Sequence, residues 1–156
     1  MLRPSNICLD PDALAERLHD APAATAALLH DVIDLACRRF PSPGQRIASE
    51  RIDRLIQAEA WADAALALTD QELPNWRVRR IAYDGGDWHC ALSRERELPD
   101  WLDQAVEAWH PDLALAILGA FIEAQSLGKR STRSSVPSVP REAGPRPIAI
   151  CCDNYA

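Results

Sequence analysis

The chain has 156 residues, 47% of them hydrophobic, which suits one globular domain with a core of its own. Its formal net charge is −6, and no apolar run approaches the ~20 residues that a membrane span requires. The first residues lack the apolar stretch of a secretory signal. We therefore expect a cytoplasmic protein that makes no membrane contact.

The five cysteines do not indicate a disulfide framework or a zinc site. They are Cys8, Cys37, Cys90, Cys151 and Cys152, and none is paired at CxxC spacing. An odd number in a chain without a visible secretory signal favours free thiols. Cys37 and Cys90 lie among apolar residues and are expected in the core. No role follows for Cys151 and Cys152, and neither a metal nor a cofactor is predicted.

The first half of the chain is predicted to be helical. Residues 1–9 show no periodic pattern and are expected to be flexible. Asp10 and Pro11 form a helix-start signature, an N-cap followed by proline at the first helical position. Apolar residues spaced three and four apart then indicate further helices. The expected helices cover 11–20, 23–40, 46–57 and, after a turn at 58–59, 61–70.

The segment Trp76–Ser93, WRVRRIAYDGGDWHCALS, predicts a β-hairpin. Gly85 and Gly86 can both adopt positive φ, which a two-residue hairpin loop requires. This turn sets an apolar face with the cross-strand pairs Tyr83–Trp88, Ile81–Cys90 and Arg79–Leu92. The other face is more polar and is expected to meet solvent; it holds Arg80, Ala82, His89, Ala91 and Ser93. Because a lone hairpin is marginal in water, the flanking helices are expected to cover the apolar face.

The chain after the hairpin is expected to form two more helices and a tail. A short helix is predicted over 99–109, and a longer one over Pro111–Leu127. The middle of the longer helix, LALAILGAFI, is apolar on nearly all sides, so it must lie between the hairpin and either the first helices or a second copy. Residues 128–156 are rich in Ser, Pro and Arg and are predicted to be disordered. Their basic character contrasts with the acidic remainder.

Residues 61–124 resemble a known module. The order is a helix with WADAALAL, then LPNW, a hairpin ending in DWHCALS, and a helix with DLALAILGAFIEA. This is similar to the αββα unit called the phage ABA sandwich domain, and to a set of small bacterial proteins without an assigned activity. The resemblance implies a fold and no catalytic residues. The predicted class is α+β: one domain over 10–127, with a helical part at 10–57 and an αββα unit at 60–127.

Two histidine clusters are candidates for a catalytic site. His89 is a possible general base and Cys90 a possible nucleophile, but neighbours on a strand point to opposite faces. His30 and Asp31 are adjacent, as in some metal-dependent phosphohydrolases, yet no further ligands follow at suitable spacing. A packed cysteine, a solvent-side histidine and an ordinary helix surface are the favoured interpretations. No catalytic residue is predicted.

The hairpin arginines and His89 are the candidates for binding. Arg77, Arg80, His89 and Arg94 could meet an anion or an acidic partner, although ion pairs with nearby helices are the simpler explanation. The five tryptophans are interpreted as core rather than as a pocket. Binding of nucleic acid is not expected, because the tail carries little charge and no interleaved aromatic residue.

The sequence favours a non-catalytic protein-interaction or assembly module. The homo-oligomer is expected to form through the Pro111–Leu127 helix, because that helix is apolar on more than one side. The alternative is a small-ligand-binding protein or enzyme that uses the polar hairpin face around His89. The partner protein is not indicated by any motif.

Overall fold

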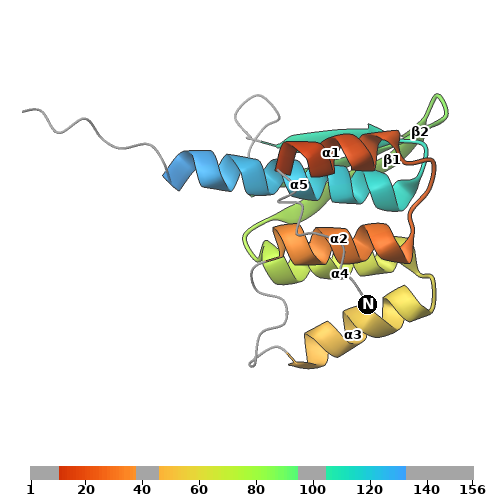
Figure 1. The fold of residues 1–156 in the computed structure, drawn as a ribbon. Helices are drawn as coiled ribbons and strands as arrows, with labels where there is room; N and C mark the ends of the chain where they lie inside the picture. The colour runs from red at the N-terminus through yellow and green to blue at the C-terminus, as the bar shows by residue number, and fades with distance from the viewer. Residues whose placement is uncertain (1–10, 38–45, 95–104, 133–156) are drawn as a thin grey trace, which may run out of the picture.

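A computed structural model of the chain describes residues 11–37, 46–94 and 105–132. In these residues, five helices and one three-stranded antiparallel sheet form an α+β fold, which confirms the predicted class (Figure 1). The sheet lies against α5, and α3 is the helix farthest from it (Figure 1). The elements are α1 (Pro11–Asp20), α2 (Ala26–Ala36), α3 (Arg46–Gln57), α4 (Trp61–Glu72), β1 (Arg77–Asp84), β2 (Asp87–Ser93), β3 (Val106–His110) and α5 (Leu113–Thr132).

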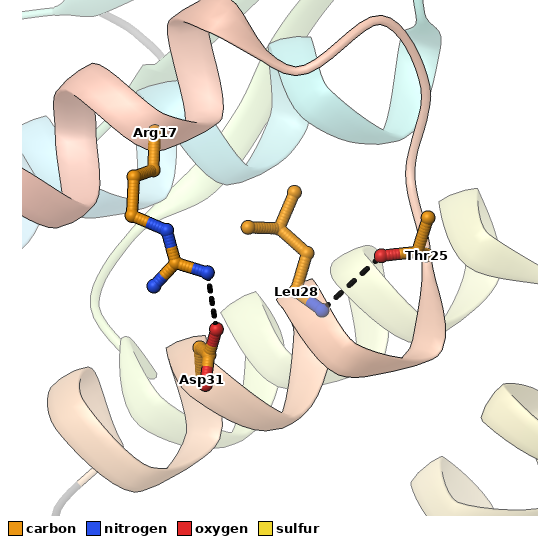
Figure 2. A network of polar contacts seen from close by, with 4 residues as sticks. All are labelled: Arg17, Thr25, Leu28 and Asp31. Carbon is orange, nitrogen blue, oxygen red and sulfur yellow. Dashed lines mark hydrogen bonds and ion pairs between the residues drawn. The ribbon is translucent and has the colours of Figure 1, made fainter.

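The bounds of α1 and α3 agree with the prediction, whereas α2 is shorter than expected. α2 begins after Thr25, which has extended backbone and accepts a hydrogen bond from the Leu28 amide at 3.3 Å (Figure 2). It ends before Cys37, whose φ of −93° and ψ of 104° are extended. The apolar spacing therefore located the helix, but the capping hydroxyl decided where it begins.

Polar contacts place α1 beside α2 and against the start of α5. Arg17 on α1 donates to Asp31 on α2 at 2.6 Å (Figure 2). Asp112 accepts from the Ala24 amide through Oδ2 at 3.1 Å. Its Oδ1 also accepts from the amides of Ala114 and Leu115, which caps α5. One carboxylate thus ties the α1–α2 connection to the first turn of α5.

The hairpin is confirmed at its turn and corrected at its far end. Gly85 and Gly86 have φ of 62° and 107°, and the pairs Tyr83–Trp88 and Ile81–Cys90 form as predicted. The predicted pair of Arg79 with Leu92 is wrong, because a bulge in β1 places Val78 opposite Leu92 instead. The bulge lets Val78 and Ile81, three residues apart, face the same side.

The helix predicted up to Trp109 is wrong over its last part, since Val106–His110 is a strand. This strand, β3, pairs antiparallel with β2 and gives the sheet order β1-β2-β3. Val106 and His110 are buried, while Glu107 and Trp109 are exposed, which is the two-residue alternation of a half-buried strand. The αββα unit therefore gains a third strand beside β2.

α5 is buried by the chain itself. The helix packs against β2 and β3 on one side and against α4 and α1 on others. Its buried positions are Ala114, Leu115, Ala116, Ile117, Leu118, Ala120, Phe121, Ile122 and Ala124. The apolar surface that suggested self-association is therefore covered within one copy. Gly119 allows the close approach to β3, because a Cβ there would lie 3.1 Å from the Ala108 Cβ.

The C-terminal bound of the domain also changes. α5 runs to Thr132, so the disordered tail predicted from residue 128 overlaps its last turns. Residues 133–156 and the predicted flexible segment 1–9 lie outside the described residues. None of the helices in the described ranges is long and apolar enough to cross a membrane.

Candidate functional site

His89 lies on the outer face of the sheet, packed between neighbouring strands. Its ring stacks on Trp109, with centroids 4.6 Å apart and the planes at 29°. Nε2 lies 3.5 Å from a carboxylate oxygen of Glu107, but it makes no hydrogen bond. The side chain is only 13% exposed. His89 therefore belongs to a cross-strand cluster and offers little surface to a substrate.

Cys90 lies on the opposite face and does not form a nucleophile pair with His89. The thiol is fully buried in the core beneath the sheet. Burial raises the pKa of the Cys90 thiol to about 11, so very little thiolate is present at neutral pH. Both the direction and the chemistry of the Cys90 side chain count against the catalytic pair.

The structure does not gather the predicted arginines into one site. Arg77 lies 3.9 Å from Asp70 in an exposed ion pair, and Arg94 lies 4.9 Å above the Trp76 ring. Arg80 is exposed opposite Ala91, on the same face as His89. The Arg77–Asp70 contact is the kind of ion pair with a nearby helix that the sequence suggested, whereas Arg94 contacts an aromatic ring.

The His30–Asp31 pair does not show the arrangement of a metal site. Asp31 is engaged by Arg17 at 2.6 Å, and the His30 side chain is exposed. Across the described ranges, no group of three or more His, Cys, Asp or Glu side chains could hold a metal ion. The cysteine at the end of α2, Cys37, is a buried free thiol. Burial, with Glu72 and Asp34 nearby, raises its pKa.

A groove that the sequence did not predict lies between α1 and β3. It consists of two hollows of about 600 Å³ and about 430 Å³. The hollows share four lining residues, Ala15, Glu107, Ile122 and Glu123, so they are continuous. One end includes Asp12 and Ala105, and the other includes His19 and His110. This α1–β3 groove therefore follows β3 along its whole length.

The groove combines an apolar floor with an acidic rim. Leu115, Ile122 and Leu127 of α5 contribute apolar surface. Three carboxylates line it, from Asp12, Glu107 and Glu123, and none of the described residues that line it is Lys or Arg. Trp109 forms part of the wall and remains 56% exposed. A groove of this kind suits an occupant that brings apolar side chains and positive charge.

The edge of β3 faces this groove. β3 is the last strand in the order β1-β2-β3, and α1 packs on α5 rather than on β3. Within the described residues, the side of β3 away from β2 is therefore without a partner strand. The backbone N–H and C=O groups of such an edge can pair with an extended segment about 4.8 Å away. The groove provides the space for that segment.

Sequence reasoning missed this site because residues 99–109 were interpreted as a helix. The alternation in VEAWH, with Val106, Ala108 and His110 facing inward, was the signal that could have found it. Five residues are too few for the alternation to decide against a helix. The acidic residues that rim the groove come from three separate segments of the chain, so they do not form a motif that can be recognised in the sequence.

Comparisons with known proteins do not add a family to this description. No family model matches the chain, and searches of curated proteins and of solved structures return no significant match. The resemblance to the phage ABA sandwich domain stays a prediction from the sequence.

Proposed function

We propose that the protein is a non-catalytic protein-interaction module whose α1–β3 groove accepts an extended segment of a protein. The observation that carries this proposal is the edge of β3, which pairs with no further strand in the described part of the chain and lies beside an apolar floor. Main-chain pairing with a sheet edge supplies affinity in this mode of recognition, and alternate side chains supply specificity. No specific observation favours the alternative, an enzyme or ligand site at His89, since neither hollow includes that residue.

The alternation of β3 defines what such a segment needs. Ala108 faces α5, so side chains beside it would rest on the floor near Gly119 and Ile122. Glu107 and Trp109 are exposed, so side chains beside them would lie at the outer wall. The preferred segment is extended, with apolar residues alternating with cationic ones that can pair with a carboxylate or stack on a tryptophan.

The test uses two tryptophan substitutions on neighbouring residues of α1. Ala15 is exposed and lines both hollows, so Ala15→Trp fills the groove without entering the core. Glu16 is also exposed and lines neither hollow, so Glu16→Trp is the matched control. Random heptapeptides displayed on phage are selected on the immobilised full chain. The recovered peptides are then measured against both variants.

Selected peptides are expected to weaken by about tenfold or more on Ala15→Trp, which is a loss of about 1.4 kcal/mol, and to bind Glu16→Trp as they bind the unmodified chain. N-methylation of alternate peptide amides is expected to abolish binding, because it removes the donors that pair with β3. Recovery of no peptides, or of peptides that bind both variants equally, contradicts the proposal.

A further inference from the structure

The opposite edge of the sheet has a face that no described helix covers. α5 packs under β2 and β3, and within the described residues no helix packs closely beneath β1. Ile81 and Tyr83 point to the same side as the buried Cys90, yet they are 37% and 61% exposed. Among the helices of residues 11–37, 46–94 and 105–132, none therefore covers the apolar side of β1.

α1, by contrast, is a helix with a side that no described strand covers. It lies beyond β3, on α5, and no described strand occupies the space between α1 and β3. The residues that α1 turns to the groove include Asp12, Ala15 and His19, all exposed. Ala15 is small and lies in the middle of this face, which leaves room for a large apolar side chain.

The two edges also carry opposite charge. The groove is rimmed by Asp12, Glu107 and Glu123. β1 reads RVRRIAYD, and Arg77 and Arg80 lie on the outer face of the sheet opposite Ser93 and Ala91. Glu107 lies opposite Ala91 from the other side of β2, so it is on that same outer face. Alternating arginine and aliphatic residues on β1 match the segment that the groove requires.

We propose that the α1–β3 groove of one copy receives the β1 edge of a second copy, so that copies join head to tail into a continuous sheet. This inference rests on the proposed function of the groove and names its occupant. Because β1 and β3 are both antiparallel to β2, they run in the same direction, and the new pair is parallel. Ile81 of the incoming copy rests over Ala15, and Arg80 meets Glu107 and Trp109.

This contact is heterologous: each copy contributes a different edge to it. Assembly therefore does not stop at two copies, unless the rotation between neighbours closes a ring. A buried, parallel extension of the sheet would cover the exposed Ile81 and Tyr83 of every copy except the first. The surface of self-association is thus the pair of sheet edges rather than the Pro111–Leu127 helix.

The test is complementation between two variants of the full chain. Ala15→Trp blocks the groove and leaves β1 intact, while Arg77→Glu/Arg80→Glu reverses the charge of β1 and leaves the groove intact. Each variant alone is expected to be a monomer by sedimentation equilibrium. An equimolar mixture is expected to form a discrete dimer, because only one productive contact remains. The unmodified chain is expected to grow in mass with concentration, less so at high salt.

Two further variants guard against an effect on folding. Ile81→Asp blocks β1 by a different chemistry and is expected to behave as the arginine variant does. Glu16→Trp is expected to assemble as the unmodified chain does. Circular dichroism of every variant should match the unmodified spectrum, and if one of the two β1 variants does not, the other β1 variant takes its place.

The outcomes separate the two proposals. If the unmodified chain stays monomeric at all concentrations while Ala15→Trp still abolishes binding of selected peptides, the groove function stands and the second-copy occupant is wrong. If the arginine variant dimerises by itself, pairing is between like edges and the head-to-tail contact is wrong. If neither peptides nor copies depend on Ala15, both proposals fail.

Discussion

β1 and β3 are the two edge strands of one sheet, and they differ in charge and in how the described helices cover them. β1 carries arginines, a bulge and an apolar face that no helix of the described ranges covers, whereas β3 is short and faces an acidic groove. Natural sheets protect edges with charge and bulges, and an edge left beside a groove is a site for pairing. β1 has positive charge and exposed apolar side chains, whereas β3 has negative charge and a groove beside it. The two edges are therefore complementary in charge and in shape.

The largest expected effect on the groove side of the sheet comes from Asp112→Ala. The substitution removes the cap of α5 and the bond to the Ala24 amide, which leaves a part-buried donor without its partner. We expect a loss of about 3 kcal/mol in the free energy of unfolding, measured by urea denaturation. Because this carboxylate ties the α1–α2 connection to α5, peptide binding to the groove should also fall.

Asp112→Asn is the control for that loss, since an amide oxygen can still cap α5. We expect it to cost about 1 kcal/mol, chiefly through the Ala24 bond. If Asp112→Asn unfolds at the same urea concentration as the unmodified chain, the cap alone matters. In that case Asp112 does not position α1, and the groove should keep its affinity.

Gly119→Val is expected to affect the β3 edge directly. A Cβ at residue 119 would already lie 3.1 Å from the Ala108 Cβ, so a branched side chain must push β3 away from α5. We expect a loss of about 2 kcal/mol on urea denaturation together with weaker peptide binding. The near-UV signal of the hairpin aromatics should persist, and its collapse would mean that both edges depend on this contact.

Tyr83→Ala tests the β1 edge with a smaller effect. The Tyr83 and Trp88 rings lie 5.1 Å apart across the strands, with planes at 54°. Removal of the pair is expected to cost about 1 kcal/mol in unfolding free energy, because such pairs add only modestly to area burial. Peptide binding to the groove should not change, and a tenfold change would show that the two edges are coupled.

Gly128→Ala is expected to have the smallest effect, and in the opposite direction. A Cβ there would lie 3.8 Å from an Arg94 nitrogen, an ordinary contact. Replacement of glycine within a helix should stabilise the protein by about 0.5–1 kcal/mol, measured by thermal or urea unfolding. Gly119→Ala gives the comparison, since the same gain is opposed there by the contact with Ala108. If both substitutions stabilise equally, the close approach of α5 to β3 is not tight.

The parts of the fold that follow from neighbouring residues were predictable from the sequence. Proline at the start of α1 and the paired glycines of the hairpin restrict φ within a few residues, so the pattern alone places them. The α1 and α3 bounds, the turn at Gly85 and the pair Tyr83–Trp88 agree with the structure for this reason.

The parts that follow from contacts between distant residues needed the tertiary structure. VEAWH suits a strand or the end of a helix, and pairing with β2 decides for the strand. The bulge in β1 accompanies the pairing of Val78 with Leu92 and of Ile81 with Cys90 on β2. The groove lies beside β3, where α1 packs on α5. Local propensity is a matter of a few tenths of a kcal/mol to about 1 kcal/mol per residue, and burial against a partner element exceeds it.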